Sequence, residues 1–128
     1  MSDAKTNLAE NRVLTWLLTT SNVTRPTAWV VALHTGDPGE DADQAELIGD
    51  GYARIAATFT VSGSTAENDA AIIFGPATAP WGTVSHFSVW DAVTGGNPLY
   101  KGALLTPRVV DATDRIAFDV GALEISED

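Results

Sequence analysis

An acidic segment between residues 35 and 50 holds the densest group of side chains that could bind a cation. It has six carboxylates and no basic residue, and calcium prefers such oxygen ligands. An EF-hand loop does not fit, because a frame that begins at Asp41 places Ala45 at its fifth position and Tyr52 at its twelfth. We therefore expect no metal site. The acidic residues are Asp37, Glu40, Asp41, Asp43, Glu46 and Asp50.

This segment is also long for a connection in a compact protein, and long loops are often functional. Its like charges repel one another and resist packing against the rest of the same chain. We expect the loop to be mobile in the isolated protein or to be ordered by a neighbouring subunit. Arg54, Arg25 or Arg108 of that neighbour would supply the counter-charges.

Two histidines are the candidates for a general base, and Ser88 lies two residues after His86, on the same face of an expected strand. Neither His86 nor His34 stands in a Gly-x-Ser-x-Gly elbow, and the chain has no cysteine. Two glycines at 95–96 follow a strand as a hairpin turn and do not open a helix, so they do not form a phosphate loop. We expect neither an enzyme activity nor a cofactor.

Four tryptophans are many for 128 residues. Trp16 and Trp29 lie on apolar faces, and we expect them in the core. Trp81 lies in a loop between proline and glycine, which favours a contact with a partner, and a sugar-binding platform would also need exposed tryptophan. The full set of candidate partner-contact residues is Trp81, Trp90, Asp91, Asn97, Arg54, Asp37, Asp41 and Asp43.

The composition excludes several classes of protein. The formal net charge of −10 repels nucleic acid phosphates and anionic lipids, so we expect neither nucleic acid nor membrane as a partner. The longest apolar runs, such as 28–33, are far shorter than the ~20 residues of a membrane span, and the acidic start at residues 1–3 does not resemble a signal peptide. With 45% hydrophobic residues, the chain can bury a core.

A helix is expected at about residues 8–19, where Trp16 and Leu17 share an apolar sector and Asn7 with Glu10 resembles a capping box. If this helix packs on the core, replacing Leu17 with alanine should cost about 2 to 5 kcal/mol. Beyond it, short runs of alternating polarity predict about eight antiparallel strands. These strands are expected at 27–34, 52–61, 70–74, 83–90, 99–105, 108–110, 115–120 and 122–126.

These elements predict a mainly β fold, a single antiparallel β-sandwich or jelly-roll-like domain over residues 1–128, with the sandwich at about 27–126. Turn motifs follow in a fixed order: LHTGDPG at 33–39, GYAR at 51–54, ATA at 77–79, WGTV at 81–84, WDA at 90–92, TGGN at 94–97 and GAL at 102–104 and 121–123. The ordered set resembles a family of small virion proteins of tailed bacteriophages, often labelled tail fibre proteins.

The resemblance implies a virion structural protein without catalytic residues. The chain has no heptads, collagen-like triplets or β repeats that could build a fibre shaft. We therefore expect a head decoration (cement) protein on the outside of the capsid shell, assembled in the host bacterial cytoplasm as a homo-oligomer. Its partners would be the major capsid protein or tail proteins, contacted through the N-terminal segment, the Trp81 loop and the 91–97 turn. The alternative is a tail, baseplate or tail-fibre module that binds a receptor or glycan.

Overall fold

The computed structural model describes residues 3–127, which form one helix and ten strands. The helix α1 spans Asn7–Leu18. Its N-cap is Thr6 and not Asn7, the expected cap. Thr6 Oγ1 accepts a hydrogen bond from the Ala9 amide (3.3 Å) and donates one to the Pro98 carbonyl (2.6 Å). The cap therefore fixes the start of the helix and ties it to a neighbouring strand.

The largest sheet has five antiparallel strands in the order β1-β8-β7-β2-β3. All five residues of β2, which pairs with the central strand of this sheet, are buried. This burial on both faces shows that other elements cover the sheet on either side. The strands are β1 (Asp3–Lys5), β2 (Val30–His34), β3 (Ile55–Ala56), β7 (Gly82–Trp90) and β8 (Pro98–Val110).

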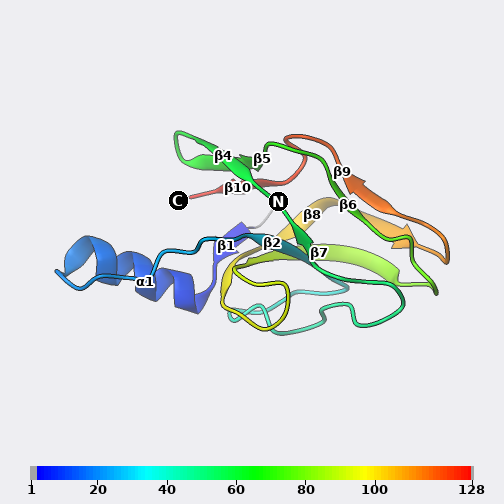
Figure 1. Cartoon of the computed structure of the whole chain (residues 1–128), viewed down its shortest axis with the longest axis horizontal. Helices are drawn as coiled ribbons and strands as arrows, with labels where there is room; N and C mark the ends of the chain where they lie inside the picture. Colours follow the sequence, from blue (N-terminus) through cyan, green and yellow to red (C-terminus); the bar gives the residue numbers. More distant parts are fainter. Residues whose placement is uncertain (1–2, 128) are drawn as a thin grey trace.

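Two smaller antiparallel sheets lie against one face of the large sheet (Figure 1). One has the order β10-β5-β4, and the other pairs β6 with β9. The main core lies between these layers and includes Leu33, Phe74 and Phe87, each fully buried. The expected mainly β, antiparallel fold with a single helix is confirmed. The bounds are β4 (Phe59–Ser62), β5 (Thr65–Asn68), β6 (Ile72–Phe74), β9 (Ile116–Phe118) and β10 (Glu124–Ser126).

The strand boundaries differ from the expected ones at several places. The segment 52–61 divides into β3 and β4, and β1 and β5 were not expected. Conversely, the segments 99–105 and 108–110 belong to one strand. Two register pairs, Val84 with Arg108 and His86 with Ala103, leave one residue of β7 opposite four of β8. Pro107 lies in this bulge, where its missing amide removes no ladder hydrogen bond, so the strand continues through it.

The helix extends away from the sheets, and a returning segment runs beside it to β2 (Figure 1). We call residues 7–29 the arm and residues 30–127 the body. Of the twelve residues of α1, Ala9 alone is buried, while Trp16 and Leu17 are 66% and 63% exposed. The expectation that Trp16 and Trp29 belong to the core is wrong, because the helix meets the body only near its first turns and Trp29, at the end of the returning segment, is 37% exposed. No helix in the described range is long and apolar enough to cross a membrane.

Candidate functional site

Arg54 and Trp90, two of the expected contact residues, meet each other inside the protein. The Arg54 guanidinium lies 4.0 Å from the centre of the Trp90 ring, in cation–π geometry. Its Nε and Nη2 atoms each donate to Glu46 at 2.9 Å, and Nη1 donates to the carbonyls of Ala92 (3.1 Å) and Gly95 (2.9 Å). Trp90 is 8% exposed. The two side chains therefore serve internal packing and are not open to a partner.

Glu46 is the acidic centre of this cluster. Partial burial disfavours its charged form, but hydrogen bonds from Arg54 and Tyr52 outweigh that effect and lower the pKa of Glu46. Burial, reinforced by the nearby Glu46 carboxylate, raises the pKa of Tyr52. The Tyr52 hydroxyl also accepts a hydrogen bond from the Leu33 amide at 3.1 Å. The cluster thus joins the acidic loop to β2 through fixed, charge-assisted hydrogen bonds.

Asp91 and Asn97 close the turn that joins β7 to β8. The Asp91 carboxylate accepts hydrogen bonds from the Asn97 amide (2.6 Å) and from its side-chain Nδ2 (2.9 Å). Some burial opposes the charged form, but these hydrogen bonds prevail and lower the pKa of Asp91. Gly96 has φ +79°, and a Cβ there would stand 2.7 Å from the Cβ of Ala92. The expected contact pair is therefore used to hold its own turn.

The acidic loop is bound by its own chain, whereas the sequence led us to expect a loop that is either mobile or ordered by a neighbouring subunit. Lys101 Nζ lies 3.7 Å from Asp37 and 3.9 Å from Glu40, and Asp41 accepts a hydrogen bond from Asn7 at 3.2 Å. The hydrogen bond from the Gly39 amide lowers the pKa of Asp37, and the charge of Lys101 lowers it further. Asp43 is exposed. Within residues 3–127 no three acidic or histidine side chains gather in a way that could hold a metal ion.

Trp81, the strongest candidate for a partner contact, is buried. Its exposed fraction is 6%, and its indole Nε1 donates to the carbonyl of Asp50 at 2.8 Å. Its ring packs edge-on against Tyr52, with 5.8 Å between centroids. The expectation of a surface contact through Trp81 is wrong. The proline and glycine on either side indicated a turn, but they could not indicate that the ring points inward.

Ser88 pairs with His34 and not with His86, the histidine that shares its strand. His34 Nε2 lies 2.7 Å from Ser88 Oγ, and His34 Nδ1 lies 2.7 Å from the Gln44 carbonyl. Because a carbonyl oxygen only accepts, Nδ1 carries the proton and Nε2 accepts from the serine hydroxyl. Ser88 Oγ in turn accepts from Trp90 Nε1 at 2.7 Å. Burial lowers the pKa of His34. Both side chains of the pair are fully buried, so the network positions the Trp90 ring.

The arm exposes several large apolar side chains, which the sequence reasoning did not place on the surface. Leu14, Leu17 and Leu18 are 58%, 63% and 76% exposed, and their i, i+3, i+4 spacing puts them on one side of α1. Val13 and Trp16 lie on a different side. Apolar residues on two sides of a twelve-residue helix exceed what one packing face requires, and this was the signal that could have revealed the arm.

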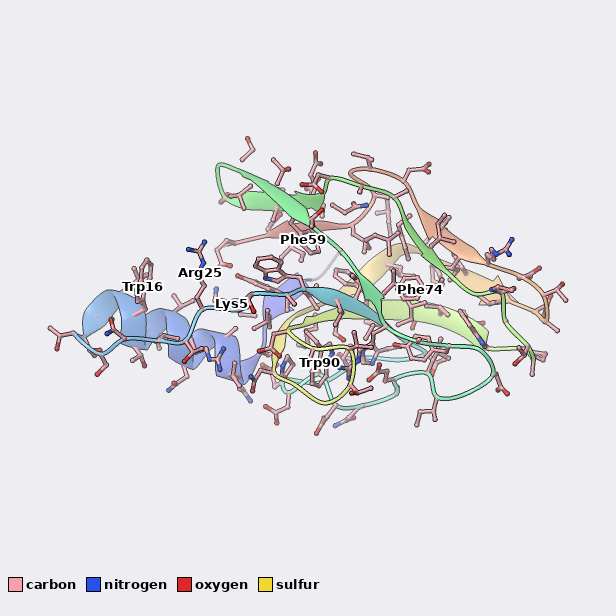
Figure 2. All side chains as sticks on the ribbon, viewed as in Figure 1. Lys5, Trp16, Arg25, Phe59, Phe74 and Trp90 are labelled. Atoms are coloured by element: carbon pink, nitrogen blue, oxygen red, sulfur yellow. The ribbon has the colours of Figure 1, made fainter. Side chains whose placement is uncertain are left out.

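A hollow lies between the arm and the hairpin of β4 and β5. It consists of two adjoining parts of about 620 and 480 Å³ that share Trp29, Leu99 and Tyr100 as a floor. We call it the arm trough. Figure 2 shows the Trp16 and Arg25 side chains on the upper side of the arm. Phe59 lies above and to the right of them, on the body. The side walls are Val13, Trp16 and Arg25 on the arm and Phe59 and Val61 on β4.

A β body with internally bonded loops and one projecting apolar arm is typical of a structural module held in a larger assembly. The model of a protein family described as the podophage GP4 fiber I protein gp80 matches residues 4–126. The chain belongs to this family and is therefore a phage fibre protein, a structural component of the virion. The match spans both the arm and the body. A comparison with curated proteins found no match.

Proposed function

We propose that this chain is an accessory component of the phage tail fibre and that its arm anchors it to other virion proteins. The fibre family supports the tail alternative over the head decoration protein that we first expected. The observation that carries the proposal is the exposure of Leu14, Trp16, Leu17 and Leu18 on a helix that projects from the body. The proposal assigns no catalytic role to the chain.

Burial energetics support an anchoring role for the arm. Burying a large apolar side chain stabilises a complex by about 1.5 to 3 kcal/mol. Four such side chains, each more than half exposed, therefore represent several kcal/mol that the isolated chain does not use. Exposed apolar patches such as the one formed by Leu14, Leu17 and Leu18 mark interaction sites in soluble proteins. A short helix with so little packing is also poorly stabilised by itself, so a partner would stabilise it further.

The receptor-binding alternative has less support from the site. A glycan platform needs an exposed aromatic ring beside polar groups, and the two candidates for it, Trp81 and Trp90, are buried. The polar groups around these rings already bond within the chain: Arg54 donates to the Ala92 carbonyl, and the Trp81 indole donates to the Asp50 carbonyl. We therefore assign the exposed Trp16 to attachment and not to sugar binding.

The test is incorporation of variant chains into virions. Leu17→Asp places a charge on the arm and should reduce the amount of the chain in purified particles at least tenfold. Leu105→Asp is the matched control, because Leu105 is 85% exposed on β8 and lies outside the arm. Mass spectrometry of separated heads and tails then gives the location. Recovery of the chain with heads, or unchanged incorporation of Leu17→Asp, would overturn the proposal.

A further inference from the structure

The arm contributes to two apolar surfaces that point in different directions. The first, which we call the leucine face, consists of Leu14, Leu17 and Leu18. The second is the arm trough, to which Trp16 and Val13 contribute from another side of the same helix. At 100° per residue, the centres of these two groups lie roughly 120° apart around α1. One copy therefore cannot cover its own trough with its own leucines.

We propose that the leucine face of one copy binds in the arm trough of a second copy, so that the chains associate head to tail. This inference rests on the proposed function, because it names a partner for the same arm. The contact joins two different surfaces and is therefore heterologous, and such contacts close into rings or continue as open arrays. A chain without repeats or heptads would gain length in this way.

Charge favours a second copy as the occupant. Glu10 lies one turn before Leu14 on the leucine face, and Arg25 lines the trough. Neither Glu10 nor Arg25 forms an ion pair inside the part of the chain that the structure describes. The contact would place Glu10 of one copy beside the trough arginine of the next. The leucine face and the arm trough therefore carry opposite charges, as two surfaces that bind each other require.

The charge distribution of the whole chain points to the same contact. Residues 7–29 have two arginines and one acid, whereas residues 30–128 have fifteen acids and four bases. Two bodies therefore repel each other, and the arm is the segment through which copies can approach. A stable protein interface typically buries about 800 Å² on each partner. To reach that area, the contact would have to bury most of the arm and of the trough. We expect reversible association in the micromolar range or weaker, strengthened when several copies are held in one particle.

Two single variants test the heterologous contact. Leu17→Asp disables the leucine face, and Val61→Asp disables the trough wall, where Val61 is 72% exposed and its replacement leaves the core intact. Each variant retains one working surface. Sedimentation velocity should show concentration-dependent association of the natural chain, monomers of each variant alone, and a 1:1 dimer when the two variants are mixed. Circular dichroism confirms that both variants are folded.

A charge exchange provides an independent measurement. Glu10→Arg and Arg25→Glu should each weaken self-association about fivefold, and an equimolar mixture should associate about as strongly as the natural chain, because both contacts between unlike copies again pair opposite charges. A natural chain that stays monomeric up to about 1 mM, or mixtures that stay monomeric, would overturn the inference. If that chain is monomeric but Leu17→Asp still fails to enter virions, the self-association fails while the anchoring function stands. If the natural chain self-associates but Leu17→Asp enters virions normally, the anchoring function fails while the self-association stands.

Discussion

Replacing Arg54 with alanine should lower the free energy of unfolding by about 3 kcal/mol, because this side chain joins three segments of the body. The guanidinium binds Glu46 with two hydrogen bonds, donates to two turn carbonyls and covers the Trp90 ring. The Arg54 and Glu46 side chains are only 10% and 22% exposed, so solvent screens the pair weakly. After the substitution, Glu46 keeps only the Tyr52 hydroxyl as a partner.

The magnitude follows from these contacts. A charge-assisted hydrogen bond contributes about 1.5 to 3 kcal/mol, and breaking a buried ion pair costs about 3 to 5 kcal/mol. The contributions are not additive, and water can reach part of Glu46 after the change, which places the expected loss near the lower bound. For a chain of this size the melting temperature should fall by about 10 °C.

Urea denaturation followed by tryptophan fluorescence measures the effect, since Trp90 lies under the guanidinium. Arg115→Ala is the matched control, because Arg115 is exposed and should change stability by less than about 0.5 kcal/mol. Arg54→Lys keeps the charge but loses the forked geometry and should give an intermediate loss. A double-mutant cycle with Glu46→Gln should give a coupling energy above about 1 kcal/mol. A loss below 1 kcal/mol for Arg54→Ala would refute the assigned role of the cluster.

Three further results are expected. In urea denaturation of the isolated chain, Leu17→Ala should change the free energy of unfolding by less than about 0.5 kcal/mol, whereas Leu33→Ala should lower it by about 2 to 5 kcal/mol. Equal losses would mean that the helix packs on the core. Because burial lowers the pKa of His34, the unfolded chain binds a proton below about pH 6.5 that the folded chain excludes. Stability should therefore decline from pH 6.5 to 5, and His34→Gln should flatten that slope; an unchanged slope would contradict the assigned shift. Trp81→Phe should cost about 1 to 3 kcal/mol, measured by thermal melting, because it removes a buried hydrogen bond to the Asp50 carbonyl, which keeps only the Thr78 amide as donor, and leaves part of the indole volume empty; a melting temperature equal to that of the natural chain would contradict this contact.

The sequence alone determined the class of fold and the family of virion proteins. Alternating polarity after Pro26 predicts antiparallel strands, because a sheet with one buried face requires a period of two. The turn motifs were informative for a similar local reason, since glycine at positions such as Gly96 permits a positive φ that a side chain would strain. The turn motifs therefore indicated the correct family, while the position within the virion did not follow from them.

The tertiary structure decided which way the aromatic and charged side chains point. Periodicity assigns Trp16 to an apolar face, but it does not reveal whether any other element covers that face, and here none in the described range does. Trp81 is buried because Asp50, thirty-one residues away in sequence, supplies the acceptor for its indole. Lys101 reaches Asp37 of the acidic loop across an even larger separation, sixty-four residues. Such contacts form only when the folded sheets bring distant segments together, so local spacing could identify the participants but could not pair them.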